Sequence, residues 1–247
     1  MQRDETHEAL VLRVRPMGVS DREAWFLTAG AGLCRAAVYG GPKSRLRSHV
    51  SPFHSGRLWL YRNPVKDSIK VTDFAVDCWR PGLRDLYERT LAADAAAETV
   101  LASHGGGGAG EEALRLACGA LDALESADEA LCERLLTWFL WRWALLLGAA
   151  PPLDGCISCG AVLGDKAWCN GEGLLCASCA GAPGSEARGA FPVGLGARRW
   201  LAAVSGLDGA RTKRCGMDAP SASQARALVT AVLARVIGRR LNTWDLV

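Results

Sequence analysis

The sequence has no stretch of about 18 uncharged apolar residues, the length that a membrane-spanning helix needs. Its longest apolar run, residues 135–147, is shorter and is interrupted by Arg142. We therefore expect a buried helix in that region. The opening segment MQRDETHEAL also has no apolar core of the kind found in signal peptides. These absences predict a cytoplasmic protein without a membrane segment.

Signatures of catalysis are missing as well. There is no G-x-x-x-x-G-K-[ST] phosphate loop, and Pro42 stands where a glycine backbone would approach a phosphate. The glycine tract Gly105–Gly108 follows an expected helix rather than a strand, so we interpret it as a flexible loop. The four histidines show no metal or triad spacing, and the carboxylates form no nuclease-like pair. The sequence therefore predicts a protein that is not an enzyme.

The cysteines show the most specific pattern in the chain. Five of the ten lie between Cys156 and Cys179, which fits a metal site in a reducing compartment better than a disulfide framework. Two C-x-x-C pairs, Cys156/Cys159 and Cys176/Cys179, are separated by 16 residues. Four thiolates complete a tetrahedral shell without an open position, so we predict one structural zinc ion. Disulfides or redox pairs are the alternatives.

The other cysteines carry no such pattern. Cys169 lies inside the same segment but has no partner at two-residue spacing, so we interpret it as a bystander rather than a ligand. We expect the remaining five to be small buried apolar residues. They are Cys34, Cys78, Cys118, Cys132 and Cys215.

Charge is unevenly distributed along the chain. Residues 1–80 hold 13 Lys or Arg against 8 Asp or Glu, residues 81–150 hold 5 against 11, and residues 151–247 hold 11 against 7. Between Glu23 and Asp67 there is no acidic residue at all. Cations without nearby carboxylates attract phosphate, and interleaved aromatic side chains offer stacking surfaces for unpaired bases. We therefore predict that this window contacts nucleic acid.

The candidate nucleic-acid-binding residues belong to this window, and its centre, residues 40–47, is expected to be a mobile basic loop between two strands. The candidates are Arg35, Lys43, Arg45, Arg47, Arg57 and Arg62. The aromatic residues Trp25, Tyr39 and Tyr61 lie among them, although several aromatics of the window should be in the core. A second basic cluster either extends the binding path or is only a solvated surface. It comprises Arg198, Arg199, Arg211, Lys213 and Arg214.

Hydrophobic periodicity predicts an α+β multidomain protein. Five short strands are expected before residue 80, with Leu10, Leu12 and Val14 alternating with Val11, Arg13 and Arg15 along the first. This pattern favours a small closed barrel, either an OB-fold or an SH3-like barrel. Helices are expected from about residue 83, and then over 111–124, 127–147, 195–204 and 222–237. We therefore predict an OB-fold domain (1–80), an α-helical bundle domain (81–152 and 184–247) and an inserted zinc module (153–183).

Several short motifs resemble those of the bacterial recombination mediator family RecO of the RecF pathway, and they occur in the same order along the chain as in that family. They are the segments 8–13 and 18–22, Gly32-Leu33 followed by 42–46, Pro52-Phe53, and then Trp143–Leu147, Gly148 and Pro152-Leu153-Asp154, which run into Cys156 and Cys159. The resemblance implies a protein of DNA repair and recombination that binds single- and double-stranded DNA and anneals complementary strands. It also implies partnership with RecR, action on strands coated by single-strand-binding protein, assistance in loading RecA, and a nucleoid-associated location.

Two other classes of function remain open. One is a zinc-scaffolded nucleic-acid-processing enzyme, and the other is a protein adaptor that uses the zinc module as a docking platform. A nuclease assay discriminates the first from a mediator, and binding to naked oligonucleotides discriminates the second.

Overall fold

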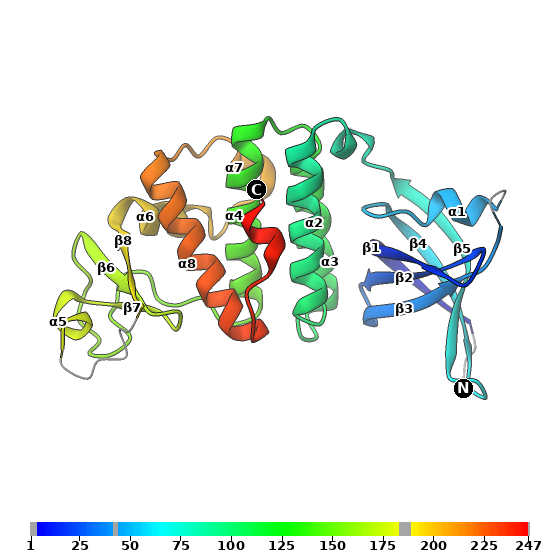
Figure 1. The fold of residues 1–247 in the computed structure, drawn as a ribbon, viewed down its shortest axis with the longest axis horizontal. Helices are drawn as coiled ribbons and strands as arrows, with labels where there is room; N and C mark the ends of the chain where they lie inside the picture. Colours follow the sequence, from blue (N-terminus) through cyan, green and yellow to red (C-terminus); the bar gives the residue numbers. More distant parts are fainter. Residues whose placement is uncertain (1–3, 42–43, 183–188, 247) are drawn as a thin grey trace. The chain divides into compact units, whose positions relative to one another are not determined.

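The structure is a computed structural model that describes residues 4–41, 44–182 and 189–246. It contains two compact units, Met1–Ser126 and Ala127–Val247 (Figure 1). Across the described ranges, every helix is too short or too polar to cross a bilayer. The expected division at residues 80, 152 and 183 stays a prediction.

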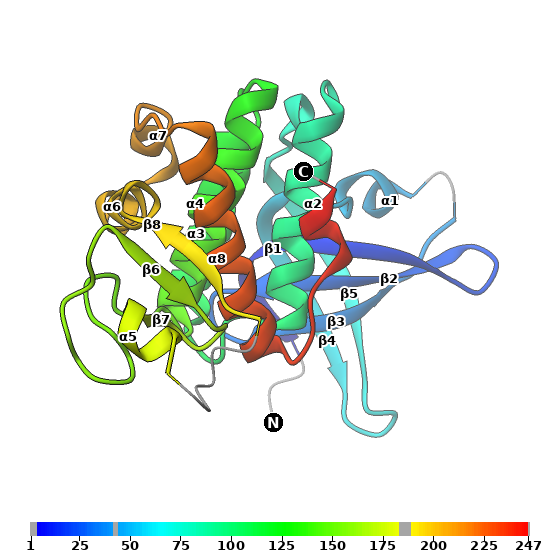
Figure 2. The same cartoon turned by 60° about the vertical axis from the view of Figure 1, so that its left-hand side comes forward.

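The first unit begins with a closed barrel of five strands (Figure 2). They are β1 (Asp4–Met17), β2 (Asp21–Thr28), β3 (Gly32–Val38), β4 (Ser55–Asn63) and β5 (Ser68–Cys78). The strand order is β1-β2-β3-β5-β4, in which β3 and β5 pair parallel and all other neighbours pair antiparallel. This arrangement confirms the predicted barrel and identifies it as an OB-fold.

The barrel interior is filled by alternate side chains of each strand, as the pleat of a sheet requires. Val11, Phe26, Leu58 and Phe74 are fully buried in it, and the rings of Phe26 and Phe74 meet edge to face at 6.1 Å. Because every strand contributes inward residues to this one cluster, burial of these side chains selects the register of the strands.

A β-bulge in β1 changes which side chains face outward. The register with β2 slips between Val11, which pairs with Phe26, and Arg13, which pairs with Trp25. Strict alternation would place Val11 on the same face as Arg13 and Arg15, and that expectation is wrong. Because the bulge adds one residue, Val11 and Val14 both contact the core, and the two arginines lie on the outer face.

Helices cover one end of the barrel. The short α1 (Arg45–His49) lies between β3 and β4, and η1 (Pro81–Arg84) leads into α2 (Tyr87–Ala102) and α3 (Gly110–Leu124). The last two pack on β1 and β2. Arg80 fixes this packing because its buried guanidinium donates to the carboxylate of Asp122 at 2.6 Å and to the carbonyl of Phe53 at 2.7 Å. The tract Gly105–Gly108 connects α2 to α3 with four positive φ angles, which confirms the loop interpretation.

The second unit is built around α4 (Glu129–Leu146), whose three tryptophans Trp138, Trp141 and Trp143 are buried. Asp128 caps its first turn by accepting from the N–H of Leu131. Around α4 lie α6 (Leu195–Val204), α7 (Gly209–Thr212) and α8 (Ala219–Ile237), and η2 (Asn242–Asp245) ends the chain. The burial of every residue from Leu135 to Trp141 confirms the predicted central helix.

The cysteine-rich segment forms a small sheet beside these helices. Its strands are β6 (Lys166–Cys169), β7 (Leu174–Leu175) and β8 (Phe191–Gly194), in the order β7-β6-β8, and α5 (Ala177–Ala180) follows β7. Such short elements lack enough residues for periodicity to reveal them, so these strands, α1, α5 and α7 could not be predicted from the sequence.

Candidate metal centre and nucleic-acid interface

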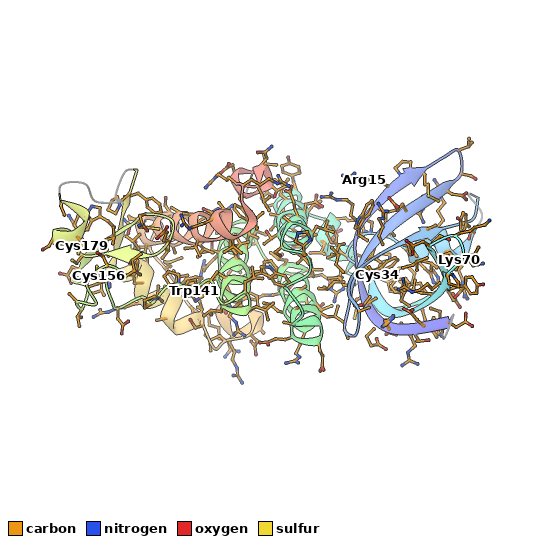
Figure 3. The ribbon with its side chains drawn as sticks, turned by 90° about the horizontal axis from the view of Figure 1, so that it is seen from below. Arg15, Cys34, Lys70, Trp141, Cys156 and Cys179 are labelled. Atoms are coloured by element: carbon orange, nitrogen blue, oxygen red, sulfur yellow. The ribbon has the colours of Figure 1, made fainter. Side chains whose placement is uncertain are left out.

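Four thiols meet in the cysteine-rich segment. The Sγ atoms of Cys156, Cys159, Cys176 and Cys179 all lie within 4.8 Å of one another, and Figure 3 places Cys156 next to Cys179. The Sγ atoms of Cys159 and Cys176 are 3.8 Å apart. Sulfurs at the corners of a tetrahedron, with metal–sulfur bonds of about 2.3 Å, are about 3.8 Å apart. The four cysteines can therefore bind a metal ion.

Local turns bring each pair together. The N–H of Gly160 donates to the carbonyl of Cys156 at 2.9 Å, and Gly160 adopts a φ of +74°, which a glycine reaches without strain. In the second pair, Cys176 is the N-cap of α5 and Cys179 lies on that helix, and the N–H of Ala180 donates to the carbonyl of Cys176 at 2.9 Å. Each pair therefore presents its two sulfurs from one tight turn of its own, as the spacing predicted.

Two of the four thiols, Cys156 and Cys179, have pKa values shifted in opposite directions. Burial opposes ionisation of Cys156, but the N–H groups of Cys176, Cys159 and Ser158 outweigh it and lower the pKa of Cys156 to about 6. The Ser158 hydroxyl lowers the pKa of Cys179, but the thiols of Cys159 and Cys176 raise it more, to about 12. Like charges this close cannot all form by themselves, so four thiolates require a cation among them.

The remaining cysteines of the described ranges stand outside this group. Cys169 is fully buried in β6, burial raises its pKa, and its sulfur accepts the N–H of Gly171 at 3.3 Å. Cys34 and Cys132 are buried as predicted. Cys78 is exposed, so its prediction is wrong, because β5 ends there at the rim of the barrel.

The predicted nucleic-acid-binding arginines lie on the barrel, but four of them have carboxylate partners. The pairs are Arg35–Glu23 at 3.3 Å, Arg45–Asp73 at 2.9 Å, Arg57–Glu8 at 3.2 Å and Arg62–Glu5 at 3.0 Å. Lys43 lies outside the described residues. In three of the four pairs the arginine side chain is more than half exposed, and exposed ion pairs contribute only about 0–1 kcal/mol, so phosphate can compete for these arginines.

Arg62 is the least available of the candidates. Its pair with Glu5 is half-buried, and the hydrogen bond to Glu5 raises the pKa of Arg62. The same bond, outweighing burial, lowers the pKa of Glu5. We therefore expect Arg62 to stabilise the barrel more than it contacts a ligand.

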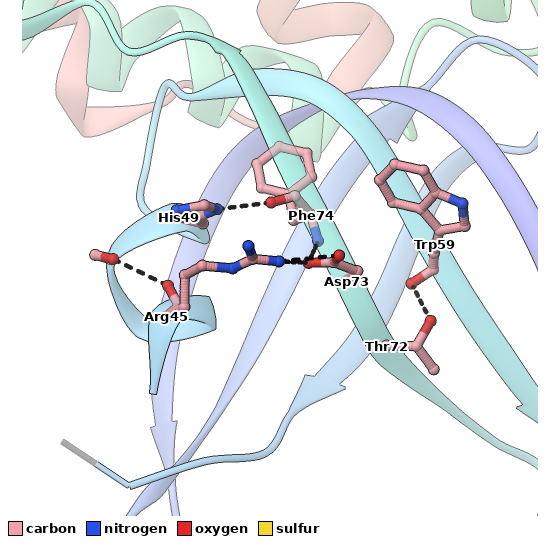
Figure 4. Close-up of polar contacts among 7 residues, drawn as sticks. Arg45, His49, Trp59, Thr72, Asp73 and Phe74 are labelled. Carbon is pink, nitrogen blue, oxygen red and sulfur yellow. Dashed lines mark hydrogen bonds and ion pairs between the residues drawn. The ribbon is translucent and has the colours of Figure 1, made fainter. Parts of the chain in front are cut away.

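Arg45 and Arg47 belong to α1, so the expected loop is partly helical. Figure 4 shows the guanidinium of Arg45 against the carboxylate of Asp73. Arg47 is exposed, and in the described ranges it forms no ion pair. The guanidinium of Arg22, from β2, donates to the carbonyl of Arg47 at 2.6 Å. These contacts gather Arg22, Arg45 and Arg47 into one basic corner at α1.

A second set of cations was missed by the sequence analysis because it flanks the acid-free window. Arg15 on β1 lies over the ring of Trp25 at 5.5 Å, and Lys70 on β5 lies over the ring of Tyr61 at 5.0 Å. Figure 3 labels both cations on the barrel. We call Arg15, Trp25, Arg35, Lys70 and Tyr61 the outer basic face. Arg13 and Arg15 alternate with apolar residues along a strand, and this alternation was the sequence signal that could have predicted cations on the outer face.

One member of the second basic cluster, Arg198, does not reach the surface. Only 3% of Arg198 is exposed, and its guanidinium donates to the carbonyls of Leu153 and Gly164, so it holds the cysteine-rich segment to α6. Arg211 pairs with Asp208 at 3.7 Å in α7. Arg198 therefore has a structural role and cannot extend a binding path.

Comparison with known proteins covers nearly the whole chain. The family profile described as Recombination protein O N terminal matches residues 1–72, and Recombination protein O C terminal matches residues 84–245. The chain is 32% identical over 200 residues to the DNA repair protein RecO of Rubrobacter xylanophilus, covering 79% of each chain. It is 27% identical over 242 residues to the DNA repair protein RecO of Syntrophus aciditrophicus, covering 96% of this chain and 92% of that one.

Proposed function

Because the chain belongs to the RecO family of DNA repair proteins, we propose that it is a DNA-binding recombination mediator that anneals strands without breaking covalent bonds. The observation that supports this proposal is the set of exposed cations on the barrel, above all Arg35, Arg45 and Arg47. The ion pairs of Arg35 and Arg45 are exposed enough for a phosphate to replace the carboxylate, and Arg47 forms no ion pair within the described ranges.

The proposed mechanism is electrostatic. Two DNA strands repel each other through their phosphates, and cations held on one rigid barrel reduce that repulsion while bases pair. No step consumes ATP. Resemblance to the family supports the further proposal that the protein works with RecR on strands coated by single-strand-binding protein, assists RecA loading, and acts in the cytoplasm at the nucleoid.

The first test is a salt titration of DNA binding. The triple variant Lys43→Ala, Arg45→Ala, Arg47→Ala is expected to bind a labelled single strand more weakly and to lower the slope of log K against log salt by about 2, since each lost contact contributes about 0.7. Arg115→Ala is the control, because Arg115 is equally exposed but lies on α3. Annealing of complementary oligonucleotides should proceed with and without ATP. Unchanged binding of the triple variant would contradict the proposal.

We also propose that the metal is a single zinc ion with a structural role. The four-thiolate donor set and the sulfur separations fit zinc and leave no open position. When bound, zinc neutralises the thiolates and links the turn at Cys156 to α5. A segment with so few large aliphatic residues needs such a link to stay folded.

The zinc proposal is tested by metal analysis of purified protein. We expect about one zinc per chain in the native protein, and loss of that zinc in the variant Cys176→Ala, Cys179→Ala. Cys169→Ala is the control, because Cys169 lies outside the four-thiol group and should leave the zinc content unchanged. Full zinc content in the double variant would disprove the assignment.

A further inference from the structure

The cysteines of the four-thiol group differ in how far solvent reaches them. Only 3% of Cys156 is exposed, whereas Cys159 is an exposed residue and Cys176 and Cys179 are half-buried. Cys159 ends the first tight turn, and its neighbours in sequence on both sides are exposed as well. A small oxidant in solution therefore meets Cys159 before the other three cysteines.

A second thiol lies within reach of Cys159. Its Sγ atom is 3.8 Å from that of Cys176, so the two sulfurs must approach by about 1.8 Å to form a disulfide of about 2.05 Å. Rotation of the two side chains can close so short a gap while the backbone stays folded. An exposed thiol next to a second thiol that can react with it is the arrangement found in oxidation-sensitive cysteines.

Backbone hydrogen bonds hold the two turns together independently of a metal. The N–H of Ile157, in the first turn, donates to the carbonyl of Leu174 at 2.9 Å, and Leu174 lies two residues before Cys176. The N–H of Cys156 donates to the carbonyl of Ala161 at 2.9 Å and closes the first turn. These bonds do not involve sulfur, so they keep the thiols close when the sulfurs react. A disulfide formed here can therefore be reduced again to two thiols in the same place.

The chemistry needs one oxidant, hydrogen peroxide, and two thiolates. Zinc binding requires the cysteines as thiolates, and the thiolate is the form that a peroxide oxidises. The Cys159 sulfur attacks one peroxide oxygen, so that an S–O bond forms, the O–O bond breaks and hydroxide leaves. The Cys176 thiolate then attacks the Cys159 sulfur, the S–S bond forms, and the S–O bond breaks to release a second hydroxide. Two thiolates thus lose two electrons, and one peroxide is reduced to two hydroxide ions.

We propose that Cys159 is a site of oxidative modification, at which hydrogen peroxide joins it to Cys176 in a disulfide and the bound zinc is released. The inference rests on the proposed zinc site and adds the condition under which that site loses its metal. A disulfide removes two of the four thiolate ligands, so the tetrahedral shell is left half empty.

Loss of the metal affects the second unit, because the cysteine-rich segment is fastened to its helices. The guanidinium of Arg198, on α6, donates to the carbonyls of Leu153 and Gly164, which precede and follow the first turn. The carboxylate of Glu172, between β6 and β7, pairs with Arg235 on α8. Oxidation is therefore expected to lower the melting temperature of residues 127–247, and reduction in the presence of zinc is expected to restore it.

The test uses the unaltered full chain, loaded with zinc and freed of reductant. Graded hydrogen peroxide should release about one zinc per peroxide consumed by the four-thiol group, because one peroxide converts one pair of thiolates into a disulfide. A chromogenic chelator measures the released zinc. Peptide mapping by mass spectrometry without reduction should show Cys159 joined to Cys176, and dithiothreitol with added zinc should restore the zinc content.

Cys78→Ser is the matched control, because Cys78 is an exposed cysteine on β5 that lies outside the four-thiol group. This variant should release zinc with the same dependence on peroxide as the native chain. Zinc that stays bound after Cys78 of the native chain has been oxidised would overturn the inference, as would a disulfide that excludes Cys159. A native chain that holds no zinc before oxidation would instead overturn the proposed zinc site.

Discussion

The ion pair between Arg45 and Asp73 provides a direct test of whether the barrel cations are available to DNA. Arg45 Nη2 lies 2.9 Å from Asp73 Oδ1 and 3.0 Å from Oδ2, and the two side chains are 68% and 45% exposed. To contact a phosphate through this nitrogen, Arg45 must leave Asp73. The variant Asp73→Asn removes the competing charge but keeps an oxygen that can accept the N–H of Phe74, as Asp73 Oδ1 does at 2.8 Å.

The size of the effect follows from the exposure of the pair. Exposed ion pairs contribute about 0.2–1 kcal/mol, which corresponds to about 1.4-fold to 5-fold in affinity. Burial raises the pKa of Asp73, but the N–H of Phe74 and then Arg45 outweigh it and lower that pKa, so the carboxylate is charged at neutral pH. We therefore expect Asp73→Asn to bind single-stranded DNA about 1.4-fold to 5-fold more tightly at low salt.

The assay is fluorescence anisotropy with a labelled oligonucleotide at several salt concentrations. Asp77→Asn is the matched control, because it makes the same charge change on β5 at an exposed carboxylate that has no ion pair within the described ranges. Combining Arg45→Ala with Asp73→Asn should abolish the gain, since the gain depends on Arg45. Weaker binding by Asp73→Asn, or an equal gain in the control, would refute the reasoning.

Two further predictions concern stability. His54 is buried, and burial, only partly offset by its bond to the His49 carbonyl, lowers its pKa below 6.5. The folded state therefore takes up a proton less readily than the unfolded chain, so stability is complete above about pH 6.5 and falls as pH drops through the lowered pKa. Urea unfolding at pH 7.5 and 5.5 should show this loss, which His54→Phe should reduce. The second prediction is that a strong chelator lowers the calorimetric melting temperature of residues 127–247 and leaves that of the barrel unit, residues 1–126, unchanged. A melting temperature that does not change on chelation would contradict a structural zinc.

The cluster of four cysteines could be predicted from the sequence because its geometry is local. Each C-x-x-C pair forms within one turn, and thiolate chemistry requires the two pairs to converge on one ion. The five strands and five longer helices could also be predicted, since their apolar periodicity repeats over enough residues. The spacing also predicted that Cys169 is not a ligand, and the structure buries it in β6 outside the four-thiol group.

The inward-facing residues of β1 could not all be predicted in the same way. A β-bulge leaves no mark in the alternation of Leu10 to Arg15, yet it places Val11 with Val14 against the core, on the face opposite Arg13 and Arg15. Bulges depend on pairing with a neighbouring strand, so periodicity in one strand does not reveal them.

By itself, the amino-acid sequence determined the four cysteines that could bind a metal ion, the barrel and helical elements, and an acid-free basic window between Glu23 and Asp67. Only the tertiary structure decided which of those cations have a carboxylate partner. Closure of the barrel places carboxylates from outside the window beside its arginines, such as Glu8 beside Arg57 and Asp73 beside Arg45. The physical reason is that strand pairing sets which charged residues are neighbours in space. Arg57 and Glu8, 49 positions apart, form an ion pair between β4 and β1, and Arg45 and Asp73, 28 positions apart, form one between α1 and β5.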